Sequence, residues 1–530
     1  MELLEKRRKK FDNYNAIYFV SPSKETVQLI KKDFVIDAEY NPEPPLYSYV
    51  HIIFNEPVDN KLIGDLCAGN QMLINNLYSL KQVCYTLHPI DEGLFSLKMS
   101  DDLNIWNKNK VSDEGMVNNI LSILSFLRNV QNIQITYDRN NNEMSKIVQD
   151  LTNKIQSVID TQFDKSYMIS KPPPVFLILL DRKEDLVTPL LQNDSYSSMF
   201  YNLLDKRENV LEFEVKDAQK KQGTEKEIGK CLLNETDFIW LEYKYKDFLS
   251  SIQDVQKAYQ TFMEENASNN KNLDVIEQIR KAPQLKEYIK DYNKHLDNFG
   301  VMSGKFKENK FSQVFLYEQC IATGLTRGGK PFEVKEINKS NVPSEFDKKR
   351  LGLLAKLLQK TDDNSIQNII FENRDPKMIG EINDAFRNIM KLSNGDLKTL
   401  AINQDADSNK QMFYKSRAAD IVYNKITNNL LEKYDSFETK DFYPKNQTSN
   451  KVFNNYIFRK NALFDESCPI VIVFMKGGLS FNEVMEINNL RQGSNLGDFI
   501  PICGGTNVYS ARTFFEYLVK DPTIVEEDKQ

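Results

Sequence analysis

The chain has 530 residues, of which 41% are hydrophobic and 27% are charged. These proportions are typical of a globular protein with well-buried cores, and they argue against a disordered chain or a membrane protein. The formal net charge of -6 argues against a general affinity for nucleic acid. No apolar run reaches the roughly 18 residues that a membrane-spanning helix needs, so we expect any membrane role to depend on partner proteins.

The first part of the chain alternates strand-like and helix-like segments. Residues 16–20 form a short apolar run that ends at Ser21-Pro22, and Ser23 is a candidate cap for the helix that follows. Residues 49–54 predict a second strand. This alternation predicts a parallel sheet covered by helices.

A second α/β unit follows. Residues 117–130 have helical spacing, and residues 175–180 are an unbroken apolar run. Such a run predicts a strand that is buried on both faces of a sheet. We expect a helix at residues 195–204 directly after it.

The middle of the chain, residues 231–450, is highly charged and predicted to be mostly helical. One helical stretch has apolar residues at alternating spacings of four and three, which is typical of a coiled coil or a long helical hairpin. Two interpretations stay open for this seam: it packs within the chain, or it receives a partner helix. Pro283 is expected at the head of this helix, where proline is tolerated. The seam consists of Leu285, Ile289, Tyr292, Leu296 and Phe299.

The last part returns to α/β patterning. Residues 470–475 and 499–503 predict two strands, followed by Gly477-Gly478 and Gly504-Gly505. Two strands do not make a stable sheet alone. We therefore expect them to complete the sheet that begins near Val175, which makes the middle region a long helical insertion. Both glycine pairs are expected to form tight turns with positive φ.

The sequence offers no recognisable catalytic set, and we predict that the protein is not an enzyme. His51, His88 and His295 are far apart, and the cysteines form no CxxC pair or metal spacing, so we expect reduced thiols, no metal and no cofactor. The glycine pairs could hold a phosphate at a helix N-terminus, but a structural turn explains them better. Asp181 and Asp185 could hold a metal or a ribose, but we expect them to cap turns or to pair with Arg182.

Several motifs resemble those of the SM (Sec/Munc) family of syntaxin-binding proteins, and they occur in the family's order. The most specific is an apolar strand followed by Asp-Arg, a second Asp and Thr-Pro, at residues 179–191. The resemblance extends over essentially the whole chain, and the motifs at 237–240, 282–284 and 442–444 look most like the exocytic branch. The other matches are at residues 16–23, 195–199, 234–240, 346–351, 474–480 and 504–506.

The resemblance implies an α/β fold with a large, mainly helical insertion. It implies an arch of three domains, of which two are Rossmann-like with parallel sheets. We expect residues 1–108 to form the first α/β domain, 109–230 and 452–530 the second, and 231–451 the helical domain. Family members carry about one more strand and helix before the Leu3–Lys10 region, on the scale of half a small lobe, so we expect a truncated start.

The resemblance also implies a function, which is binding a syntaxin and assisting SNARE assembly and membrane fusion. A syntaxin would occupy the cleft between the first and third domains, and the helical hairpin would align a vesicle SNARE beside it. Aligning two disordered helices in advance removes part of their ordering entropy. The residues expected to serve this role are Pro283, Leu285, Ile289 and Tyr292. Leu87 and Trp106 are candidates for a pocket that binds the syntaxin N-terminal peptide.

We therefore expect a cytoplasmic protein that partners recruit to membranes, with the plasma membrane and exocytosis favoured. Three alternatives stay open. The first is an SM protein of the ER–Golgi or endolysosomal pathway. The second is an α/β enzyme that binds a nucleotide at the glycine turns, and the third is a scaffold of this fold that has lost SNARE binding.

Overall fold

The computed structural model divides into two compact units, Met1–Leu87 with Ser112–Arg128, and His88–Val111 with Asn129–Gln530. The structure describes residues 4, 10, 13–35, 45–55, 58–83, 87–99, 103, 113–127, 132–162, 174–204, 210–214, 228–233, 236–270, 275–326, 328–371, 375–395, 401–403, 413–442, 468–493 and 499–520.

The smaller unit contains a three-stranded parallel sheet with strand order β1-β2-β3. Alternate residues such as Tyr18 and Ile52 are buried beneath the neighbouring helices, as expected for strands with one covered face. Ser23 caps the first helix by accepting from Thr26 N at 3.1 Å, as predicted. The elements of this unit are β1 (Ala16–Val20), α1 (Lys24–Lys32), β2 (Val50–Phe54), α2 (Asn60–Cys67), α3 (Gln71–Asn76), β3 (Leu77–Gln82) and α4 (Asp113–Phe126).

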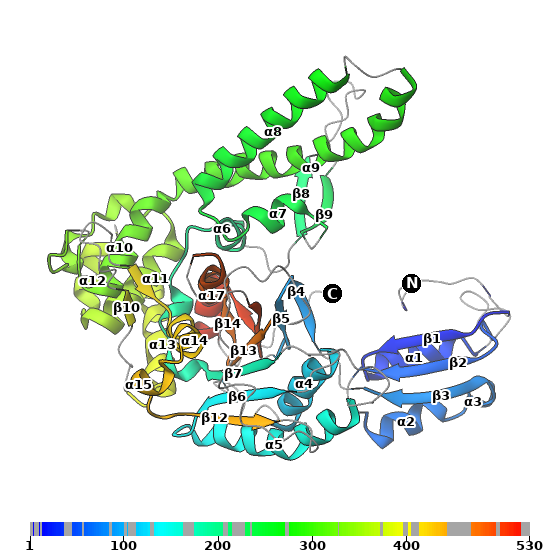
Figure 1. The fold of residues 1–530 in the computed structure, drawn as a ribbon. Helices are drawn as coiled ribbons and strands as arrows, with labels where there is room; N and C mark the ends of the chain where they lie inside the picture. Colours follow the sequence, from blue (N-terminus) through cyan, green and yellow to red (C-terminus); the bar gives the residue numbers. More distant parts are fainter. Residues whose placement is uncertain are drawn as a thin grey trace. The chain divides into compact units, whose positions relative to one another are not determined.

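The larger unit is built on a seven-stranded sheet with strand order β12-β6-β7-β13-β15-β5-β4 (Figure 1). The five inner strands are parallel, and the two edge strands are antiparallel. All seven residues of β7 are buried, which confirms the prediction of a two-sided buried strand. The strands are β4 (His88–Asp91), β5 (Leu94–Ser96), β6 (Ile133–Asp138), β7 (Val175–Asp181), β12 (Phe437–Phe442), β13 (Ile470–Lys476) and β15 (Ile500–Gly505).

The strands near residues 470 and 500 do complete the sheet begun at Val175. Ile470 lies opposite both Val175 and Ile500 in the parallel register. The prediction of an α/β fold with a large, mainly helical insertion is therefore confirmed. Helices of this unit outside the insertion are α5 (Asn142–Gln162), α6 (Tyr196–Leu203), α17 (Phe481–Gly493) and α18 (Ala511–Val519), with the short helices η2 (Arg182–Glu184) and η3 (Thr188–Leu190).

The insertion between α6 and β13 is mostly helical, and in the part that the structure describes it contains two antiparallel pairs of short strands besides β12, which joins the main sheet. Its helices are α7 (Phe238–Tyr243), α8 (Phe248–Asn270), α9 (Val275–Glu308), α10 (Phe311–Thr323), α11 (Glu345–Gln359), α12 (Asp363–Ile370), α13 (Pro376–Leu392), α14 (Arg417–Ile426) and α15 (Leu430–Lys433), with η4 (Val334–Glu336) and η5 (Lys339–Asn341). The short strands of the larger unit are β8 (Val210–Glu214), β9 (Ile228–Leu232), β10 (Ala401–Asn403), β11 (Phe413–Lys415), β14 (Leu479–Ser480) and β16 (Val508–Tyr509).

The three domain boundaries proposed from the sequence stay a prediction. The main sheet includes strands from outside the predicted second α/β domain. The strand β5 comes from the segment 1–108 and pairs with β15, and β12 comes from the segment 231–451 and pairs with β6. The helix α4 belongs to the compact unit that holds β1, β2 and β3.

The two glycine pairs differ in conformation. Gly477 and Gly478 have φ of +85° and +87°, as predicted for a tight turn after a buried strand. Gly504 and Gly505 lie inside β15 and not in a turn, so the prediction for this pair was wrong. A Cβ on Gly504 would lie 2.4 Å from the Phe95 ring, so close strand packing requires glycine there.

The acidic residues Asp181 and Asp185 after β7 have a structural role, as expected. Asp181 caps η2, and Asp185 accepts from Thr188 N at 2.9 Å and from Thr188 Oγ1. Of the two structural roles expected for these carboxylates, capping is therefore the one observed, and the Arg182 guanidinium pairs with Glu483 at the start of α17. The sheet brings these two residues together from opposite sides of the insertion.

Candidate functional site

The helices α8 and α9 pack against each other as a long hairpin (Figure 1). The predicted seam lies on α9, and Tyr292 and Phe299 are both buried. The Tyr292 ring contacts the rings of Tyr259 and Phe262 on α8, with centroids 5.3 Å and 5.7 Å away. Packing within the chain, the first of the two interpretations, is therefore confirmed for this part of the seam.

The other end of the seam is less covered. Leu285 and Ile289 are partly exposed, and Tyr288 beside them is 48% exposed. An exposed apolar side chain on a helix is available to a partner helix. Leu285 and Ile289 therefore remain candidates for a binding surface, whereas Tyr292 belongs to the hairpin's own aromatic core.

Pro283 is not at the head of its helix, which corrects the sequence prediction. The helix α9 begins at Val275 and continues through Pro283 to Glu308. Proline has no N–H, so one hydrogen bond of the helical ladder is missing at this point. The residues from Val275 to Ala282 extend the helix ahead of the proline. An interior proline is a weak point at which a helix can bend.

A buried polar cluster fixes α9 to the body of the insertion. His295 lies 2.9 Å from the Tyr196 hydroxyl and 3.0 Å from the Asp237 carboxylate. Asp237 also caps α7 by accepting from Trp240 N at 2.9 Å, and Lys294 pairs with it at 2.9 Å. Burial raises the pKa of Asp237, but the bonds from His295, Trp240 and Lys294 outweigh it and hold that pKa well below its usual value. The base of the hairpin is therefore anchored.

The two candidates for the peptide pocket are Leu87 and Trp106. Leu87 is partly exposed immediately before β4. Trp106 lies outside the described residues. Their role in binding a syntaxin N-terminal peptide stays a prediction.

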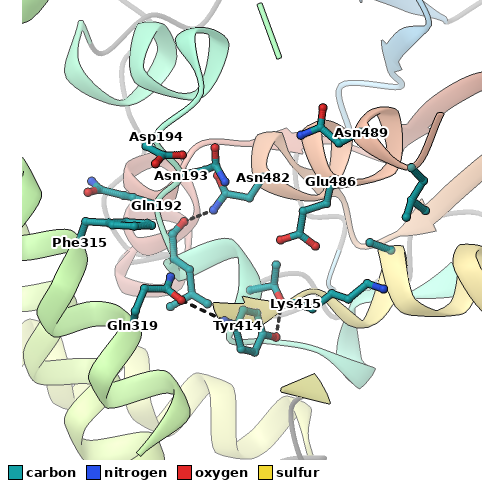
Figure 2. A pocket seen from close by; sticks show the side chains of 14 residues that line it. Gln192, Asn193, Asp194, Phe315, Gln319, Tyr414, Lys415, Asn482, Glu486 and Asn489 are labelled. Atoms are coloured by element: carbon teal, nitrogen blue, oxygen red, sulfur yellow. Dashed lines mark hydrogen bonds between the residues drawn. The ribbon is translucent and has the colours of Figure 1, made fainter. Parts of the chain in front are cut away.

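A separate cavity of about 420 Å³ lies where α10, α14 and α17 meet β11 and the segment after η3 (Figure 2). The Glu486 side chain extends from α17 toward β11 (Figure 2), and its Oε2 accepts from Ser416 N at 2.9 Å and from Ser416 Oγ at 2.6 Å. Gln192 also lines the cavity, and its Oε1 is buried. Sequence reasoning missed both residues, because they come from segments 294 positions apart that only the tertiary fold brings together.

The family-like segment at residues 179–191 forms one wall of this cavity through Thr188 and Leu191. The hydroxyl oxygens of Thr188 and Tyr414 lie 2.6 Å apart. Both are buried with Asp185. The polar residues of this segment therefore hold the sheet to the insertion.

The glycine turns leave little room for a phosphate. A Cβ on Gly477 would lie 2.4 Å from Leu103 and 2.8 Å from Arg182. At the start of α17, Ser480 N donates to Glu483 at 2.9 Å, so a carboxylate already occupies the position an anion would take. Among the described residues, no group of three His, Cys, Asp or Glu side chains is placed to hold a metal ion. No described helix is both long and apolar enough to cross a membrane.

Comparisons with known proteins agree over nearly the whole chain. A model of the Sec1 family matches residues 1–517. Vacuolar protein sorting-associated protein 45 of Mus musculus is 20% identical over 511 residues, covering 94% of this chain and 84% of that protein. Protein SLY1 of Saccharomyces cerevisiae is 24% identical over 448 residues, covering 77% of this chain and 65% of that protein.

Solved structures of the same kind share the fold. The Unc18–syntaxin 1 complex from Monosiga brevicollis matches with a TM-score of 0.69 at 18% identity, covering 97% of this chain and 89% of that chain. The SM protein Vps45 in complex with the Qa SNARE Tlg2 (1-310) matches with a TM-score of 0.65 at 15% identity, covering 97% and 88%. The match to a family model along 1–517 and this shared fold lead to one conclusion: the chain belongs to the Sec1 family.

Proposed function

We propose that this protein is an SM regulator of vesicle-mediated transport that binds a syntaxin-type (Qa) SNARE and assists SNARE assembly. The observation that carries the proposal is the family match over residues 1–517. Related structures support it, since they hold Unc18 with syntaxin 1, Vps45 with the Qa SNARE Tlg2, and Sly1p with an N-terminal peptide of Sed5p. On this proposal the protein acts at membranes through its partners and performs no catalysis.

The pathway we propose is endosomal or vacuolar sorting, and not exocytosis. The exocytic preference depended on short motifs, whereas proteins named vacuolar protein sorting-associated protein 45 from mouse, rat, human, yeast and Dictyostelium discoideum match 94–98% of this chain. The likeness to protein sec1 of Dictyostelium discoideum covers 68% of this chain. The ER–Golgi pathway is the second candidate, because the SLY1 likeness has the higher identity of 24%.

We place the SNARE-binding surface on the hairpin, at Pro283, Leu285, Ile289 and Tyr292. Leu285 and Ile289 are one turn apart on α9 and partly exposed, which fits the apolar anchors that a partner helix needs. Tyr292 supports this surface from within, because its ring packs on α8. Pro283 lies half a turn before Leu285 and weakens the helix there.

The test uses the full-length protein and cytoplasmic domains of endosomal, ER–Golgi and plasma-membrane syntaxins from the same organism. We expect co-elution with the endosomal syntaxin, at an affinity at least about tenfold above that for the plasma-membrane one, a difference of about 1.4 kcal/mol. Failure to bind any of the three would overturn the SNARE proposal. Binding only the ER–Golgi or the plasma-membrane syntaxin would overturn the pathway.

The surface is tested separately with the double variant Leu285→Glu/Ile289→Glu. We expect it to lose assistance of SNARE assembly in a liposome fusion assay, because two charges replace the apolar anchors. Val301→Glu is the matched control, since Val301 is 56% exposed on the same helix. Equal activity of both variants and the wild type would remove the hairpin from the proposal and would favour a scaffold without SNARE function.

The nucleotide-binding alternative has its own test. Gly477 and Gly504 face protein atoms where a phosphate would need space. We expect no thermal stabilisation by common nucleotides. A saturable rise in melting temperature would favour an enzyme.

A further inference from the structure

The cavity beside α17 has a chemical character that the proposed SNARE surface does not explain. Its volume of about 420 Å³ falls in the range of small-ligand sites. Its walls come from one compact unit, through α10, α14, α17, β11 and the segment after η3. Its polar lining combines the two carboxylates of Asp194 and Glu486 with amide and hydroxyl groups and one lysine.

Gln192 provides a buried acceptor that the described residues leave unused. The residue is 6% exposed, and no described residue donates a hydrogen bond to its Oε1. The orientation of the Gln192 amide is constrained, because Nε2 donates to Asp347 Oδ1 at 3.4 Å. A flipped amide would place its oxygen against that carboxylate, and two acceptors cannot form a hydrogen bond. A buried carbonyl oxygen without a donor is destabilising, so a donor from a ligand would be favourable.

Glu486 provides a carboxylate that lines the cavity, and no described cation lies within ion-pair distance of it, although the charge of Lys415 acts on it from farther away. Its two recorded donors are the N–H and the hydroxyl of Ser416, both on Oε2. Lys415 lines the same cavity, but its ammonium lies 3.8 Å from Asp420 and 4.6 Å from the centre of the Tyr423 ring. Burial raises the pKa of Glu486 to about 7, although the bonds from Ser416 and the charge of Lys415 act to lower it.

Two more features favour a cation as the occupant. Asp194 adds a second carboxylate to the lining, and burial together with the nearby Asp247 raises its pKa. Phe315 and Tyr414 add aromatic rings to the walls, and aromatic faces attract ammonium and guanidinium groups. An anion would find one lysine there, and that lysine is already paired.

We propose that this cavity binds a guanidinium or ammonium group, with Glu486 as its ion partner and Gln192 Oε1 as a hydrogen-bond acceptor. The group can come from an arginine or lysine side chain of a polypeptide or from a free organic cation. A guanidinium suits the site best, because it carries five N–H donors where an ammonium carries three. The proposal does not depend on SNARE binding by the hairpin.

The experiment titrates the full-length protein with Nα-acetylarginine amide by calorimetry at pH 8. The neutral isostere Nα-acetylcitrulline amide is the ligand control. We expect saturable binding of the arginine compound, and binding of the citrulline compound at least about tenfold weaker. Equal binding of the two, or no saturable binding of the arginine compound up to about 10 mM, would overturn the proposal.

Variants locate the binding. Glu486→Gln keeps the side-chain shape, and we expect it to weaken binding about tenfold or more. Gln192→Met keeps the volume and removes the acceptor, and we expect a several-fold loss. Glu308→Gln, at an exposed position on α9, is the matched control and should bind like the wild type. Unchanged binding by both cavity variants, with folding verified by circular dichroism, would place the ligand elsewhere and overturn the assignment.

A second arm distinguishes the two sources. A capped pentapeptide with one central arginine among alanines is compared with Nα-acetylarginine amide and with agmatine. Binding of the pentapeptide at least as tight as that of the amide supports a side chain from a polypeptide. Binding of agmatine with exclusion of the pentapeptide supports a free organic cation.

Discussion

Arg182 donates from Nη2 to both carboxylate oxygens of Glu483, at 2.7 Å and 2.5 Å, across 301 positions of sequence. Both side chains are fully buried. Arg182 follows β7 and Glu483 lies in the first turn of α17. The pair therefore joins the two parts of the sheet domain that the helical insertion separates.

Removing one partner of this pair should destabilise the fold strongly. Arg182→Met leaves the Glu483 carboxylate buried without its cation, and we expect a loss of about 3–5 kcal/mol in the free energy of unfolding. Urea unfolding followed by circular dichroism measures it. Lys183→Met is the neighbouring control, because its pair with Glu143 is 32% and 36% exposed, so its loss should stay below about 1 kcal/mol. Equal losses for the two variants would contradict a special role for the buried pair.

Gly504 should not tolerate even one added methyl group. The Cβ of Gly504→Ala would lie 2.4 Å from the Phe95 ring, and overpacking of this kind costs about 1–3 kcal/mol. Gly380→Ala is the opposite case, since no atom lies within 4 Å of its added Cβ in α13. We expect that helix substitution to stabilise by about 0.5–1 kcal/mol. Melting temperatures of the two variants should move in opposite directions, and a stable Gly504→Ala protein would contradict the packing argument.

Glu486 should make stability depend on pH. Its folded pKa of about 7 exceeds the ordinary value of 4.5, because burial and the nearby Glu483 outweigh the bonds from Ser416 and the charge of Lys415. The folded state therefore holds a proton that the unfolded chain has lost between these values, and stability falls as pH rises through this window. We therefore expect the free energy of unfolding of the wild type to fall by about 1–3 kcal/mol between pH 4.5 and pH 7, relative to that of Glu486→Gln.

Urea unfolding of the wild type and of Glu486→Gln at several pH values checks this dependence. A constant difference between the two proteins across the window would show that Glu486 titrates normally. Addition of Nα-acetylarginine amide should reduce the loss at pH 7, because a bound cation favours the ionised carboxylate.

Pro283 should limit the stability of the hairpin. Pro283→Ala restores one N–H to the interior of α9 and removes a residue that costs up to about 3 kcal/mol in a helix. We expect slower hydrogen exchange in the N-terminal half of α9. If the hairpin aligns SNAREs in its extended form, the variant should also speed SNARE assembly in the liposome assay. Faster exchange in α9 would contradict the weak point that we assign to Pro283.

Much of the fold could be predicted because its signals are local. The apolar run at 175–180 can be buried on both faces only inside a sheet, and the strands near 470 and 500 needed a partner sheet, which β7 provides. The seam of α9 followed from helical spacing, and Tyr292 and Phe299 do lie buried. Pro283 shows the limit of this reasoning, since a proline at a helix head and one inside a helix look alike in sequence.

The sequence by itself determined the fold class, the helical insertion and the family resemblance, because strand and helix periods and short ordered motifs are properties of neighbouring residues. Only the tertiary structure decided the ion partner of Arg182, the reason for Gly504 and the cavity that joins Gln192 to Glu486. Each of these depends on which segments the sheet places side by side. Contacts between residues hundreds of positions apart carry no local signal, because the energy that fixes them comes from burial and packing in the assembled core.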